Sequence, residues 1–131
     1  MTVTQESSAV AVARAHVEAW SNHDFDTARR SLADDVKVTV TSTNPALPVT
    51  DTTGVEDYMS GLVQFAQGVI PGSANVIATY GDERNALVML TVKAAFPPDG
   101  AEVTLPASRL YLLDDDDKIK VEQVVFYLVS E

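Results

Sequence analysis

The sequence predicts an α+β domain in which a curved antiparallel sheet wraps around two N-terminal helices and a third helix. The result would be a cone with one pocket. Two observations carry this prediction. Residues 4–21 and 55–66 each place apolar residues at three- and four-residue spacing, as amphipathic helices do. Residues 74–129 read as four strands joined by short turns, which is typical of an antiparallel meander.

The N-terminal half contributes two helices and the start of the sheet. The apolar stripe of the first helix consists of Val10, Ala13, Val17 and Trp20. Asp24 is the expected N-cap of a short second helix. Valines alternate with polar residues over 36–41, which predicts a half-buried strand, and 47–51 is the expected return strand.

The later strands are expected at 74–80, 85–96, 101–113 and 118–129. A tight hairpin at 97–100 would pair Phe96 with Ala101 and Val88 with Arg109. One face of the strand 85–96 is wholly apolar, so this face should point inward and bring Arg109 with it. A second hairpin, closed by the four residues 114–117, would then set Arg109 directly opposite Glu122.

An inward Arg109 beside an inward Glu122 has two interpretations. The pair can be structural and join two strands, because burying either charge alone costs several kcal/mol. It can also be functional, with Arg109 holding a ligand oxyanion or carboxylate while Glu122 transfers a proton. An arginine partner lowers the pKa of a carboxylate and so weakens it as a base.

The opposite face of the last two strands is also apolar. Its residues are Leu110, Leu112, Ile119, Val121, Val125, Tyr127 and Val129. A sheet that is apolar on both faces is covered on both, so we expect a homodimer through this outer face. A single β-bulge would reverse the alternation and place Arg109 outside.

The composition of the chain disfavours several classes of binding partner and cofactor. Its 131 residues are the length of one domain, 1–131, and the net charge of −10 disfavours nucleic acid and anionic membranes. Cysteine is absent and only two histidines occur, so we expect no metal, no cofactor and no disulfide. The start of the chain lacks the pattern of a signal peptide, and no apolar run reaches the ~20 residues of a membrane span, so a cytoplasmic location is expected.

The acidic run 114–117 suggests calcium only superficially. It lacks the alternating ligands and the glycine of a calcium-binding loop. A solvated hairpin tip is therefore the expected role of these four aspartates.

Three segments resemble the nuclear transport factor 2-like superfamily, which includes ketosteroid isomerase, SnoaL-type polyketide cyclases and limonene epoxide hydrolase. They are Ala19–Asp26, Leu32–Val36 and Lys118–Tyr127. The resemblance covers nearly the whole chain and implies a cone-shaped fold with a deep pocket, usually in a homodimer. These motifs are short and structural, so they bear on fold more than on activity.

The catalytic residues of these relatives mostly differ here. The resemblance places His16 where ketosteroid isomerase has a tyrosine, Val40 at its basic aspartate and Arg109 at its second aspartate. Val124 stands where limonene epoxide hydrolase has its last aspartate. Glu122 can stand in for the inward acidic group of SnoaL-type cyclases.

Two functions remain open from the sequence. The first is an acid–base isomerase, cyclase or dehydratase acting on a small apolar carbonyl or hydroxyl compound, with His16, Arg109 and Glu122 as catalytic residues. The second is a non-catalytic dimeric module that binds a ligand or another protein. In either case the expected ligand-binding residues are Trp20, Val40, Tyr58, Leu62, Leu90, Val92, Phe96, Tyr111, Val124 and Phe126.

Overall fold

The computed structural model describes residues 8–42, 50–95 and 101–126 of the chain. Its helices are α1 (Ser8–Ser21), α2 (Phe25–Arg30) and α3 (Val55–Ala66). Its strands are β1 (Leu32–Ser42), β2 (Thr50–Thr53), β3 (Asn75–Gly81), β4 (Asn85–Ala95), β5 (Glu102–Leu113) and β6 (Ile119–Phe126). This order confirms the predicted α+β class.

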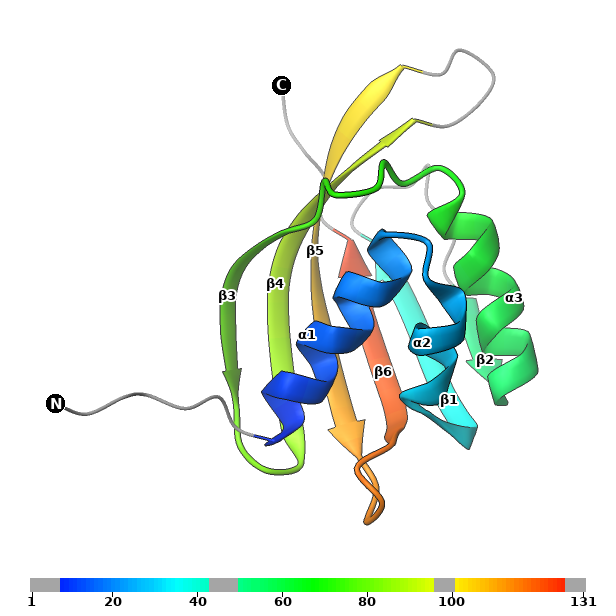
Figure 1. Cartoon of the computed structure of the whole chain (residues 1–131), viewed down its shortest axis with the longest axis vertical. Helices are drawn as coiled ribbons and strands as arrows, with labels where there is room; N and C mark the ends of the chain where they lie inside the picture. Colours follow the sequence, from blue (N-terminus) through cyan, green and yellow to red (C-terminus); the bar gives the residue numbers. More distant parts are fainter. Residues whose placement is uncertain (1–7, 43–49, 96–100, 127–131) are drawn as a thin grey trace, which may run out of the picture.

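The strands form one six-stranded sheet in the order β2-β1-β6-β5-β4-β3. Strands β1 and β6 run parallel, and the other neighbours are antiparallel. All three helices lie on one face of the curved sheet, with α1 across its middle and α3 over the β1–β2 edge (Figure 1). Between this face and the helices lies the apolar core, which includes Val17, Trp20, Val88 and Leu90.

The predicted pairing of β4 with β5 is confirmed. Val88 pairs with Arg109, Leu90 with Ala107 and Ala94 with Val103. Along β4 the buried residues alternate with more exposed ones, as the sequence pattern indicated. Arg109 therefore points to the helical face of the sheet and is 4% exposed.

The predicted pairing of β5 with β6 is wrong by two residues. Arg109 pairs with Val124, and Glu122 pairs with Tyr111, so Arg109 and Glu122 are diagonal neighbours. Leu113 pairs with Ile119 instead of Lys118, so the connection 114–118 is one residue longer than the expected 114–117. Within it, Asp117 takes a positive φ of 59° and the Asp114 N–H donates to the Lys118 carbonyl. A bulge next to this loop shifts the register by one further residue.

These two shifts cancel for every residue beyond the bulge. Glu122, Val124 and Phe126 keep the inward direction that the sequence predicted, and all three are buried. Of the residues expected on the apolar outer face, Ile119, which lies between the loop and the bulge, changes sides. It was expected on the outer face and is instead fully buried opposite Leu113.

Helix α3 is tied to the sheet at both ends by main-chain hydrogen bonds. At its start, the Gly54 N–H donates to the Val36 carbonyl over 2.8 Å. After its end, the Ile70 N–H donates to Lys93 over 2.9 Å, and the Ala95 N–H donates to Gly68 over 2.8 Å. The helix is therefore held across the sheet rather than attached at one side.

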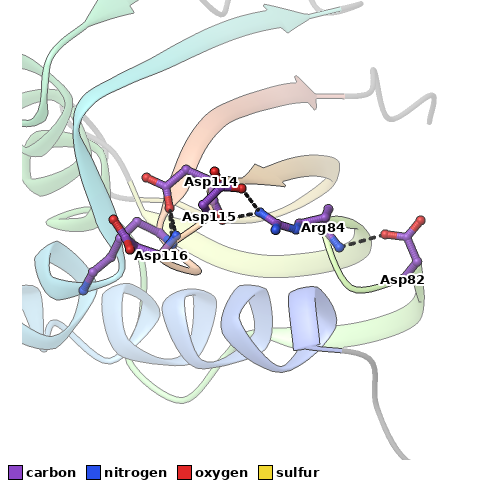
Figure 2. Close-up of polar contacts among 6 residues, drawn as sticks. Asp82, Arg84, Asp114, Asp115 and Asp116 are labelled. Atoms are coloured by element: carbon purple, nitrogen blue, oxygen red, sulfur yellow. Dashed lines mark hydrogen bonds and ion pairs between the residues drawn. The ribbon is translucent and has the colours of Figure 1, made fainter.

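The acidic turn 114–117 is a hydrogen-bonded structure at the surface. One carboxylate oxygen of Asp114 accepts from the main-chain N–H groups of Asp116 and Lys118, each over 2.9 Å. Arg84, from the turn between β3 and β4, donates to the Asp114 carbonyl and to the Asp115 carboxylate (Figure 2). The cluster thus joins two neighbouring turns.

The outer face of the sheet carries the remaining apolar residues of β5 and β6. Leu110, Leu112, Val121 and Val125 are half-buried there, whereas Tyr127 and Val129 lie outside the described residues. Among the described helices, none is long and apolar enough to cross a membrane.

Candidate functional site

A cavity of about 630 Å³ lies between helix α3 and the β2-β1-β6-β5 part of the sheet. This volume suits a small organic ligand. Most of its wall is apolar, and Arg109 and Glu122 contribute the charged groups of its sheet side. The lining residues are Val38, Val40, Thr50, Thr52, Asp57, Tyr58, Gly61, Leu62, Gln64, Phe65, Arg109, Glu122, Val124 and Phe126.

The structure separates the predicted site residues into two groups. Those that line the cavity are Val40, Tyr58, Leu62, Arg109, Glu122, Val124 and Phe126. Those that are buried in the core and do not line it are His16, Trp20, Leu90, Val92 and Tyr111. Phe96 lies outside the described residues.

Arg109 and Glu122 form a buried ion pair on the cavity wall. An Arg109 Nη1–H donates to Glu122 Oε2 over 3.2 Å, and the two side chains are 5% and 2% exposed. The guanidinium carbon also lies 4.6 Å from the centre of the Trp20 ring, so the cation stacks on an aromatic face. Trp20 thus packs against the Arg109 guanidinium without lining the cavity itself.

Tyr58 connects Glu122 to His16. The Tyr58 hydroxyl donates to Glu122 Oε1 over 2.7 Å and lies 2.9 Å from His16 Nε2. His16 Nδ1 is 3.1 Å from the Ala28 carbonyl, which can only accept, so Nδ1 carries a proton. His16 therefore reaches the cavity only through Tyr58.

Sequence reasoning named Tyr58 only as an apolar wall residue and missed this link. Tyr58 stands beside the apolar stripe of α3, one turn before Leu62, where a tyrosine is usually core. Its hydroxyl gains a partner because α3 crosses the sheet above β6 and next to α1. That placement depends on tertiary packing, which local periodicity does not encode.

The comparisons with known proteins agree with this architecture. A family model described as the SnoaL-like domain matches residues 13–122. The chain belongs to the SnoaL-like domain family. A search of curated proteins found no match.

Solved structures show the same nuclear transport factor 2-like fold as this SnoaL-like domain. A protein from Kribbella flavida DSM 17836 is 23% identical, with a TM-score of 0.75, covering 92% of this chain and 88% of its own. A protein of ketosteroid isomerase-like fold from Catenulispora acidiphila DSM 44928, in complex with trimethylamine, is 12% identical, with a TM-score of 0.72 and coverages of 89% and 85%. An LEH-like epoxide hydrolase from M. tuberculosis is 20% identical, with a TM-score of 0.69 and coverages of 91% and 82%.

Burial and neighbouring charges set the protonation of the polar groups in this SnoaL-like domain. Burial alone would raise the pKa of Glu122, but the Arg109 charge, together with His16 and Tyr58, leaves it below its usual value. Burial lowers the pKa of His16 to about 4, although the Glu122 charge opposes this shift. At neutral pH, Glu122 is therefore ionised and His16 is neutral.

Three buried polar atoms near this site have no partner with full hydrogen-bond geometry among the described residues, although the Tyr111 hydroxyl still helps to lower the pKa of Glu122. They are Trp20 Nε1, Arg109 Nε and the Tyr111 hydroxyl. Burial, followed by the Glu122 charge, raises the pKa of Tyr111 and of Tyr58 well above its usual value, so both hydroxyls stay protonated. An otherwise apolar cavity whose wall carries buried groups with perturbed pKa values, here Tyr58 and Glu122, is typical of a functional site.

The other described parts of the chain each have fewer features of a binding site than this cavity. No group of three or more histidine, cysteine, aspartate or glutamate residues could hold a metal ion there. A smaller hollow of about 230 Å³ lies between α1 and the segment 72–76 and includes Arg14 and Glu18. The acidic turn is occupied by its own N–H groups and by Arg84.

Proposed function

We propose that this SnoaL-like protein binds a small, mostly apolar carbonyl or hydroxyl compound in the cavity and moves one of its protons. The observation that carries the proposal is the Arg109–Glu122–Tyr58 cluster on the wall of an apolar cavity of about 630 Å³. An apolar wall favours the body of such a ligand, and the cluster supplies a proton carrier and a cation.

Glu122 and Arg109 have different roles in the proposed reaction. Glu122 is ionised and lines the cavity, so it can accept a proton from a carbon next to a carbonyl group. Arg109 also lines the cavity, and its charge stabilises the negative charge that then develops on the ligand oxygen. Return of the proton to another atom gives an isomerisation, and loss of a hydroxyl group gives a dehydration.

The experiment measures deuterium incorporation from D₂O into 2-tetralone and 1-indanone by proton NMR. We expect the wild-type protein to accelerate exchange, and Glu122→Gln to lower this rate by roughly 10²–10⁴-fold, the usual contribution of general acid–base catalysis. Glu102→Gln is the matched control, because Glu102 is an exposed carboxylate on β5 outside the cavity. Equal exchange by the wild type and Glu122→Gln would reject Glu122 as the proton carrier.

A passive binding protein is the second candidate. It is favoured by Val40 and Val124, two apolar residues of the cavity wall where the resemblance expects acidic groups. It is also favoured by the lowered pKa of Glu122, which makes this carboxylate a weaker base. In that case the ketones would shift protein NMR signals of cavity residues without any exchange above the buffer rate.

We also propose a homodimer through the outer sheet face. Leu110, Leu112, Val121 and Val125 support it, because they alternate with the buried residues of β5 and β6 and so point away from the inner face of the sheet. All three helices lie on that inner face (Figure 1). Sedimentation analysis would check the assembly, and a monomer at all concentrations would reject it.

A further inference from the structure

The polar groups behind the cavity form a chain whose hydrogen bonds can be counted. Its contacts are Ala28 O to His16 Nδ1 at 3.1 Å, His16 Nε2 to Tyr58 Oη at 2.9 Å, and Tyr58 Oη to Glu122 Oε1 at 2.7 Å. Each of these three contacts needs one proton between its two atoms, because lone pairs facing each other repel. The chain is fully hydrogen-bonded only when it holds three protons.

The resting chain is one proton short. Neutral His16 supplies one proton, the Tyr58 hydroxyl supplies one, and ionised Glu122 supplies none, which leaves two protons for the three contacts. Whichever way the Tyr58 hydroxyl turns, one of its two short contacts has no proton. Both contacts of the Tyr58 hydroxyl are direct, at 2.9 and 2.7 Å, and the three side chains are buried, so the missing proton leaves two polar atoms facing each other in a setting of low dielectric.

A third proton completes the chain in either of two placements. It can make His16 an imidazolium that donates to Tyr58, while Tyr58 donates to Glu122. It can instead make Glu122 a carboxylic acid that donates to Tyr58, while Tyr58 donates to neutral His16. These two forms carry the same charge and differ only by proton shifts through the Tyr58 hydroxyl.

We propose that His16, Tyr58 and Glu122 act as one proton-accepting unit, in which a proton taken up at Glu122 is shared with His16 through Tyr58. The proposal rests on the proton transfer proposed above. The ligand C–H or O–H bond breaks, its electron pair stays on the ligand beside Arg109, and the proton bonds to Glu122. As Glu122 passes this proton to the Tyr58 oxygen, the former Tyr58 proton passes to His16 Nε2, and the reverse steps return it.

This arrangement offsets the effect of Arg109 on Glu122. Arg109 weakens the carboxylate as a base, whereas proton uptake creates a hydrogen bond that the resting chain lacks. His16 is a positioning residue in this scheme, since it does not line the cavity. The charged or titratable groups facing its ring are Tyr58 from α3, Tyr111 and Arg109 from β5, and Glu122 from β6.

The test is an acid titration of the full chain by NMR, with ¹⁵N-labelled histidine and ¹³C-labelled glutamate carboxyl groups. In the wild type we expect the His16 ring and the Glu122 carboxyl signals to change with one common midpoint, because a shared proton belongs to the unit. In Tyr58→Phe, which removes only the linking hydroxyl, the two midpoints should separate by about one pH unit or more. Two separate midpoints already in the wild type, or a common midpoint that survives in Tyr58→Phe, would overturn the proposal.

Tyr111→Phe is the matched control. Its ring centre lies 5.9 Å from that of His16, but its hydroxyl does not bridge His16 and Glu122. The common midpoint should persist in this variant. Because the titration needs no ligand, a coupled unit in a protein that exchanges no ketone proton would support the shared proton and reject only the proposed activity.

Discussion

Two ion pairs in this protein, Arg109–Glu122 and Arg84–Asp115, have similar geometry and different surroundings. Arg109–Glu122 spans 3.2 Å, with side chains 5% and 2% exposed. Arg84–Asp115 spans 2.9 Å, with side chains 51% and 96% exposed (Figure 2). The shorter contact is the less consequential one, because water screens exposed charges and replaces either partner when the other is removed.

Arg109→Leu is the substitution for which we expect the largest loss of unfolding free energy. It leaves Glu122 buried without its cation, which typically costs about 3–5 kcal/mol of unfolding free energy. Urea unfolding at pH 7 would measure this loss. Arg84→Leu is the matched control, and its loss should be much smaller, since exposed pairs contribute at most about 1 kcal/mol. Equal losses would contradict the assignment of Arg109 as a buried charge.

The pH dependence of stability is the next largest expected effect. The pKa of His16 falls from 6.5 in the unfolded chain to about 4 in the folded protein, so the unfolded state binds more protons between these values. Stability should therefore decrease as the pH falls from about 6.5 to about 4, by about 3 kcal/mol for this group. Urea unfolding over this range should show the decrease in the wild type and in His23→Gln, and much less of it in His16→Gln. A profile equally steep in His16→Gln would show that other groups cause the decrease.

The smallest expected effect is a difference in unfolding free energy between substitutions of Asp114 and Asp115 in the exposed turn. Asp114 accepts two main-chain N–H groups of its own turn, whereas the contact that Asp115 makes is with Arg84. Asp114→Ala should therefore cost about 2 kcal/mol of unfolding free energy, since two hydrogen bonds of about 1 kcal/mol each are lost. Thermal unfolding should show a clear decrease for Asp114→Ala and almost none for Asp115→Ala. Decreases of equal size would mean that the turn depends on the ion pair instead.

The sequence was sufficient for the fold because the fold depends on periodic patterns. The alternation along β4 set its pairing with β5 and thereby the inward direction of Arg109. Glu122 was also expected on the inner face, and it lies there. Its partner on β5 was predicted wrongly, because four successive aspartates do not reveal which of them adopts a positive φ. The resulting one-residue error in register was followed by a one-residue bulge that the sequence pattern does not predict, so Glu122 still faces inward.

The site was harder to predict than the fold, since it depends on how α1, α3 and β6 meet. His16 and Glu122 were both expected to transfer protons in the pocket. In the structure they are joined through Tyr58, and only Glu122 lines the cavity. A hydroxyl that links residues 42 and 64 positions away cannot be read from spacing along the chain. The catalytic roles stay predictions until exchange and titration are measured.

Helix α3 forms one wall of the cavity, and its attachment at both ends bears on the kinetics of ligand exchange. A helix fixed at one end can move as a hinged unit, and such hinge motions take microseconds to milliseconds. Helix α3 would first have to break main-chain hydrogen bonds, such as Gly54 to Val36 at one end or Ala95 to Gly68 at the other. Moving the whole helix aside would therefore require local unfolding at one of its ends, which is slower and rarer than a free hinge motion.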